Sequence, residues 1–153
     1  MGVLDLVQEM LLEPATRNLF YFGSGVTRRW PDGEIAVGGE IFENETWREM
    51  AREIPGDGLG LFLIVSGDTV VASNQTQHPV YISIANLPVA YRDPRLFALL
   101  PVPYVRRPHG KKGERLDADQ KRGKAQLKND ALAIALAPLE IPAQIGVPVQ
   151  NFI

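Results

Sequence analysis

One acid interrupts the most strand-like stretch of the chain, which reads LFLIVSGDTVVAS over residues 61–73. Asp68 follows an apolar run and is followed at once by Thr69, Val70 and Val71. Ser-Gly-Asp is typical turn chemistry, so Asp68 can belong to the turn of a hairpin. Alternatively, it lies at the mouth of a sheet, where a rigidly held carboxylate is a good ligand for a hard cation such as Mg²⁺ or Mn²⁺. Both interpretations are open on residue type alone.

A second group that could do chemistry is the basic segment at residues 106–124. Clustered lysines and arginines are what contacts with nucleic-acid phosphates require. A solvated loop is the alternative, because the segment also carries Glu114, Asp117 and Asp119. The candidate nucleic-acid-binding residues are Arg106, Arg107, Lys111, Lys112, Lys121, Arg122 and Lys124.

Composition narrows these options. The 153 residues are enough for one domain with a core, and the net charge of -2 predicts that any binding to nucleic acid is weak and salt-sensitive. With no cysteine and only two histidines, the chain does not favour a zinc site, and thiol catalysis and disulfides are excluded. The first residues lack a basic signal-peptide region, and no apolar run approaches a membrane span. We therefore expect a nuclear or cytoplasmic protein that is neither secreted nor membrane-bound.

The elements that must position these residues follow from periodicity. Apolar residues at helical spacing predict a helix over residues 3–12, and a second short helix within residues 43–58 begins at a capping Asn44. Between them, residues 18–26 predict a short strand and a turn. These elements make up an N-terminal extension at residues 1–58.

Three strand-like segments follow at residues 59–71, 78–88 and 95–105, and their short connections predict an antiparallel meander. The first of these segments forms either one strand or a pair of strands. A helix over residues 117–137 comes next, and the tail beyond it is expected to be irregular. The predicted fold is an α/β domain of the α+β type. The apolar stripe of the last helix is predicted to consist of Leu127, Ala131, Ile134 or Ala135, and Leu136.

The order of these features resembles the central segment of Plavaka-type transposases, which belong to fungal mobile elements of the cut-and-paste class. That family has a strand ending in Ser-Asp-Lys-Thr, a Pro-Val/Leu-Tyr strand closing on Ile-Gly-Asn, an arginine-bearing turn, a Leu-Pro-x-Pro strand and a basic helix ending in Leu-x-Pro-Leu. An upstream tryptophan-bearing stretch, residues 39–55 here, is also similar. The matching residues are Asp68 and Thr69, then Pro79-Val80-Tyr81, then Ile84-Ala85-Asn86, then Arg92, then Leu100-Pro101-Val102-Pro103 and Leu136-Ala137-Pro138-Leu139.

The resemblance implies a partial RNase H-like core of the DDE class at residues 59–140, followed by an irregular tail at residues 141–153. Such cores use two Mg²⁺ or Mn²⁺ ions to clamp the attacking and leaving oxygens of a phosphodiester. By this resemblance, Asp68 is the catalytic residue and first metal ligand. Because Ser66-Gly67-Asp68-Thr69 departs from Ser-Asp-Lys-Thr, Asp68 either keeps the family's position or stands one residue late, on the other face of the strand.

Three hypotheses follow. The chain is a truncated transposon-derived fragment that has no complete catalytic site and is inactive alone, a DNA-binding module that uses the basic segment, or a metal-dependent nuclease in which Asp68 works with a downstream acid such as Asp130. A core without its later strands leaves a sheet edge unpaired. We therefore also expect self-association through that edge, with DNA rather than a membrane as the other partner.

Overall fold

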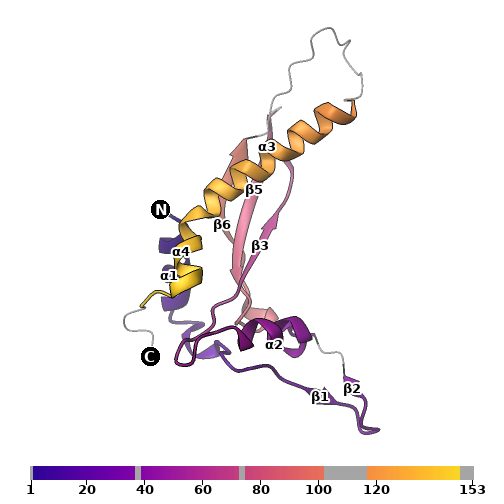
Figure 1. Cartoon of the computed structure of the whole chain (residues 1–153), viewed down its shortest axis with the longest axis vertical. Coiled ribbons are helices and arrows are strands. Elements are labelled where there is room, and N and C mark those ends of the chain that lie inside the picture. The colour runs from indigo at the N-terminus through magenta and orange to yellow at the C-terminus, as the bar shows by residue number, and fades with distance from the viewer. Residues whose placement is uncertain (1, 37–38, 73–74, 102–116, 149–153) are drawn as a thin grey trace.

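The computed structural model describes residues 2–36, 39–72, 75–101 and 117–148, which form an antiparallel sheet with helices packed on it (Figure 1). The helices are α1 (Val3–Leu12), α2 (Glu45–Arg52), α3 (Ala118–Leu136) and α4 (Glu140–Ile145), with short 3₁₀ turns η1 (Arg17–Leu19), η2 (Ile41–Glu43), η3 (Val89–Tyr91) and η4 (Ala137–Leu139). The strands are β1 (Arg28–Arg29), β2 (Ile35–Ala36), β3 (Leu63–Gly67), β4 (Val70–Ala72), β5 (Gln75–Ile84) and β6 (Arg95–Pro101). The mixed composition confirms the predicted α+β class.

The central strand of the main sheet is β5. It pairs antiparallel with β6 on one side and with both β3 and β4 on the other. Because Gly67 faces Val80 and Val70 faces Gln77, the two short strands share one register without a slip. The antiparallel meander predicted from three sequence segments is therefore confirmed. These strands alone do not define an RNase H-like core.

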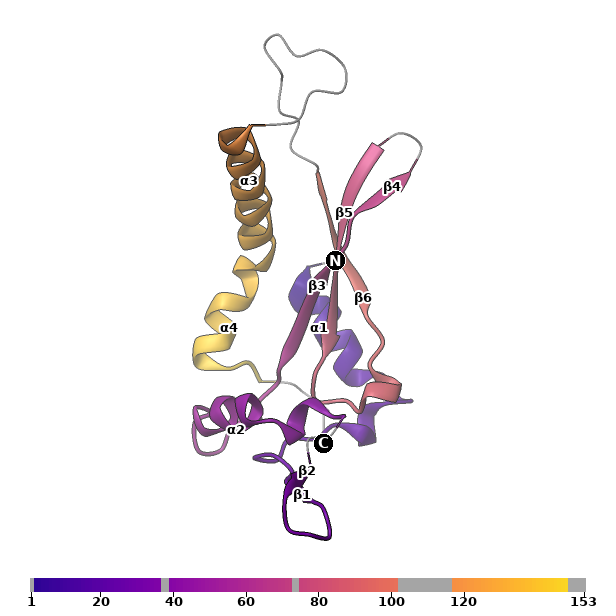
Figure 2. The same ribbon diagram turned by 90° about the vertical axis from the view of Figure 1, so that its right-hand side faces the viewer.

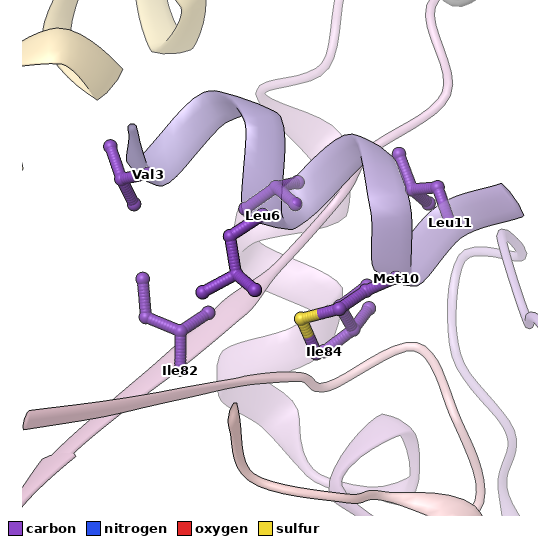
Figure 3. Close-up of a cluster of buried hydrophobic side chains, with 7 residues drawn as sticks. Val3, Leu6, Met10, Leu11, Ile82 and Ile84 are labelled. Atoms are coloured by element: carbon purple, nitrogen blue, oxygen red, sulfur yellow. The ribbon is translucent and has the colours of Figure 1, made fainter. Parts of the chain in front are cut away.

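Helix α1 supplies the other half of the core. Its apolar side chains recur every three or four residues, so they fall on one face and bury Ile82 and Ile84 of β5 completely (Figure 3). Burial of each large aliphatic side chain contributes about 1.5–3 kcal/mol. The buried residues of this helix are Val3, Leu6, Val7, Met10 and Leu11.

Helix α3 confirms the predicted helix, but the predicted apolar stripe is partly wrong. Leu127 is 55% exposed and Ile134 is 75% exposed, whereas Leu136 and the following Leu139 pack against the core cluster. Ala131, Ala135 and Leu136 of the predicted stripe are half-buried, and so is Leu132, which the stripe did not include. Leu127 and Ile134 therefore lie on the exposed side of the helix.

The tail and residues 18–26 also differ from the prediction. Residues expected to be irregular form η4 and α4, and α4 ends where Gly146 adopts a positive φ of 75° that glycine tolerates. Residues 149–153 lie outside the described residues. The short strand predicted within residues 18–26 does not form. This segment instead runs over an aromatic cluster, where the indole nitrogen of the fully buried Trp47 donates to Gly23 O at 2.9 Å.

A buried amide joins this N-terminal segment to the sheet. The Oδ1 atom of Asn86 accepts from Phe62 N at 2.9 Å, while its Nδ2 donates to Tyr21 O and Gly60 O, each at 2.8 Å. In addition, Asn86 O accepts from Tyr21 N at 2.9 Å. The side chain is fully buried, and its hydrogen-bonding groups are matched to three backbone groups on two segments of the chain.

We therefore predict that Asn86→Ala lowers the free energy of unfolding by about 3 kcal/mol or more, because each buried partner left unpaired costs about 1–3 kcal/mol. Urea unfolding followed by circular dichroism measures this change. Asn129→Ala, the same substitution at an exposed site on α3, is the matched control and should change stability by less than about 0.5 kcal/mol. Equal effects of the two substitutions would contradict the role assigned to Asn86.

Candidate functional site

The structure places Asp68 between β3 and β4, inside one line of pairing rather than at the end of a hairpin. Asp68 N donates to Pro79 O at 3.1 Å, and the pairing continues beyond it to Ala72 opposite Gln75. The hairpin-turn interpretation of Ser-Gly-Asp is therefore wrong. The preference of Ser-Gly-Asp for a turn is local, and the hydrogen bonds with β5 on both sides of Asp68 keep this segment extended instead.

The break between β3 and β4, at Asp68 and Thr69, has a cause in the opposite strand β5. In an antiparallel sheet, when the N–H of one residue donates to the carbonyl of the residue opposite, the N–H of that opposite residue normally donates back. Pro79 has no N–H, so Asp68 O receives no bond from it. The Nδ1 atom of His78 lies 3.3 Å from that oxygen and 3.0 Å from Thr69 Oγ1. In the tautomer with the proton on Nδ1, His78 donates in place of the missing ladder bond.

Alternation along the strand settles the face on which Asp68 lies. Leu63 and Val65 stand opposite Ile84 and Ile82, whose side chains face α1. Since successive side chains alternate, the Asp68 side chain points to the face away from α1. It is exposed, and its Oδ1 accepts from Thr69 N at 2.6 Å. The carboxylate is thus oriented and accessible.

The Asp68 carboxylate is a suitable ligand for a hard divalent cation, but one carboxylate is too few to form a metal site. Across the described ranges, no group of three or more His, Asp or Glu side chains could hold a metal ion. A two-metal centre needs several carboxylates to fix both ions. The helical acids have other contacts: Asp117 caps α3 through Gln120 N at 2.8 Å, and Asp130 accepts from Gln126 Nε2 at 2.7 Å.

Some of the basic candidates lie among the residues that the structure describes and others lie outside them. Arg106, Arg107, Lys111 and Lys112 lie outside the described residues. Lys121, Arg122 and Lys124 lie on the first turns of α3, next to Lys128, which the sequence analysis did not single out. The Arg122 side chain is 84% exposed, and its guanidinium lies 4.0 Å from the carboxylate of Asp119.

A cavity in the described part of the chain lies elsewhere. It has a volume of about 760 Å³ between α1, residues 54–61 and α4, and its lining is mainly apolar. Asp57 is the one acid among its lining residues, and neither Asp68 nor any of the basic candidates lines it. The cavity is therefore separate from the candidate site. Among the helices described, none is long and apolar enough to cross a membrane.

We predict that Asp68→Asn leaves the fold intact, with a change in the free energy of unfolding below about 0.5 kcal/mol. The substituted amide keeps an oxygen that can accept from Thr69 N, and the exposed carboxylate has no other described partner. Urea unfolding of both proteins tests this. A loss of several kcal/mol would mean that the carboxylate stabilises the fold, and Asp68→Asn could not then serve as a clean probe of metal binding.

Comparison with known proteins identifies the family. The family model described as Plavaka transposase matches residues 3–152, which is nearly the whole chain. No curated protein and no solved structure gave a match. The family match agrees with the resemblance expected from the ordered strand and helix motifs. The chain belongs to the Plavaka transposase family.

Proposed function

We propose that this transposon-derived chain contacts the phosphate backbone of DNA through the basic half of α3. The observation that carries the proposal is the placement of Lys121, Arg122 and Lys124 together on the first turns of that helix. The opposite end of α3 is anchored by Leu136 against the core cluster, so the basic end lies away from the core (Figure 2). Membership in a transposase family supports DNA as the polyanion.

Electrostatics limits the strength of this contact. Asp117 and Asp119 lie in the turn next to the basic residues, and the whole chain carries a net charge of -2. Binding through a few phosphates on an acidic protein weakens steeply with salt, since each contact releases counterions. We expect measurable binding at low salt and its loss near ~200 mM salt.

We predict that the double substitution Lys121→Glu and Arg122→Glu abolishes binding to a labelled duplex at low salt. Fluorescence anisotropy measures the affinity of each variant at low salt, and a salt series on the wild-type chain gives the number of phosphate contacts from the slope. The control Arg29→Glu with Arg52→Glu changes net charge equally at exposed sites on β1 and α2. Equal losses from the two double variants would contradict a localised contact.

We also propose Asp68 as one ligand of a divalent cation, within a core of RNase H-like type that this chain does not complete alone. The supporting observation is geometric. The backbone of Asp68 is fixed by Pro79 O, and the exposed carboxylate is held by Thr69 N. A rigid strand is a suitable support for a metal ligand. Because one carboxylate cannot hold two ions, we expect no strand cleavage by the isolated chain.

Isothermal titration of Mn²⁺ tests this second proposal. We expect weak binding by the wild-type chain, because a hard cation prefers carboxylate oxygen, and its loss in Asp68→Asn. Asp57→Asn, at another exposed loop acid, should leave Mn²⁺ binding unchanged. If Mn²⁺ does not bind the folded wild-type chain, or if Asp68→Asn binds it equally well, Asp68 is not a metal ligand.

A further inference from the structure

The outer edge of β3 carries backbone groups that the described residues leave unpaired. Phe62 O accepts from Ala85 N, just beyond the end of β5, so Phe62 and every second residue after it bond toward β5. The N–H and C=O groups of Leu63, Val65 and Gly67 therefore point away from β5. No hydrogen bond from the described part of the chain reaches them. Residues 58–67 also lack the charged side chains and prolines that usually protect a sheet edge.

The cavity of about 760 Å³ described above borders this edge, because Leu61 and Leu63 are among its lining residues. Its other walls are mainly apolar side chains of α1 and α4. Apolar surface is left uncovered at this cavity, since Leu59 is 53% exposed and Ile145 is 79% exposed. Unpaired backbone groups and uncovered apolar side chains thus lie next to each other.

These two features together define the chemistry of an occupant. Outward N–H and C=O groups that recur about every 6.8 Å are matched by an extended polypeptide, whereas the backbone groups of a helix are already bonded to each other. A small apolar molecule would fill the cavity but leave the edge groups unpaired. Asp57 is the one charged residue that lines the cavity, so a basic residue of the occupant is favoured beside it and an acidic one is disfavoured.

We propose that the β3 edge and this cavity bind an extended peptide segment of a partner protein, which adds one strand to the sheet. The segment carries apolar side chains at alternate positions and a basic residue near Asp57. Peptide residues opposite Leu63 and Val65 bond their outward backbone groups. Because residues that stand opposite each other in paired strands lie on the same face, the side chains of these peptide residues point toward α1 and the cavity. A single strand brings no helix layer with it, so η4 and α4 keep their places beside α1.

A labelled peptide tests the two requirements for the occupant. The probe is a fluorescein-labelled octapeptide with alternating valine and threonine between terminal lysines. Its control has the same composition with the valines adjacent, so that they cannot all face the cavity. We expect fluorescence anisotropy to show the alternating peptide binding at least about tenfold more tightly, since the control loses the burial of at least one apolar side chain. Equal binding of the two peptides, or binding of neither, would overturn the proposal.

The charge of the occupant is tested with the same peptide. Replacing its lysines with glutamates should weaken binding to the wild-type chain, because the acidic peptide approaches the Asp57 carboxylate. In Asp57→Asn this difference between the basic and acidic peptides should shrink. A peptide with glutamates that binds the wild-type chain as well as the basic one would contradict the proposed chemistry.

Matched variants test whether both the edge and the cavity are used. Val65→Pro removes an outward N–H and keeps the ladder bonds to β5, while Val71→Pro makes the same change on β4, away from the cavity. Ala143→Phe narrows the cavity from α4, and Ala133→Phe adds the same ring at an exposed site on α3 that does not line it. Val65→Pro and Ala143→Phe should each weaken binding at least about tenfold, and the two controls less than about twofold.

Circular dichroism shows which of these variants are folded. A folded Val65→Pro or a folded Ala143→Phe that binds the alternating peptide as the wild type does would overturn the proposal. Sedimentation velocity of the wild-type chain examines the other occupant that could pair with the edge. A dimer that does not bind the peptide would mean that a second copy covers the edge, and would also overturn the proposal. None of these measurements depends on DNA or metal binding.

Discussion

The buried amide of Asn86 is the interaction on which the arrangement of this chain depends most. It joins the end of β5, the segment before β3 and the N-terminal segment at Tyr21, and none of its polar atoms lacks a partner. An amide placed in an apolar interior is costly unless every group is paired, so the surrounding backbone has to adopt one geometry. The aromatic cluster around Trp47 packs beside this junction and fixes the approach of α2.

Two of the ordered motifs shared with Plavaka transposases have structural roles that the geometry makes visible. Asn86 ends the motif that follows β5, and Val80 of the Pro-Val-Tyr motif is buried in the sheet. Pro79 removes one ladder bond in the central strand, and His78 stands where it can replace it. Such residues specify the sheet and its turns. A family resemblance built on them therefore predicts a fold more directly than it predicts catalysis.

The helix at residues 3–12 was predictable because the spacing of its apolar residues matches the face that packs on β5. Helix α2 was predictable because Asn44 is a typical capping residue, and its side chain accepts a hydrogen bond from Trp47 N. The strands were predictable from alternation. Three features were not. Turn chemistry at Ser66–Asp68 gave way to a long-range ladder with β5. Leu127 and Ile134 of the predicted helix stripe are exposed, while Leu132 outside it is half-buried. In the segment at residues 18–26, Tyr21 bonds Asn86 instead of a strand. For the candidate site, residue type predicted the exposed carboxylate of Asp68, but spacing in sequence cannot reveal which acids meet it in space.

The contact between α1 and β5 also sets the order in which the chain can fold during synthesis. About 70 residues separate the end of α1 from Ile82, the strand residue it covers. At roughly 5–20 residues per second, the apolar face of α1 waits about 4–14 s before its partner strand has been made. Closing so long a loop is a non-local step, which slows folding. The apolar side chains of residues 3–12 are therefore made well before the main sheet that covers them exists.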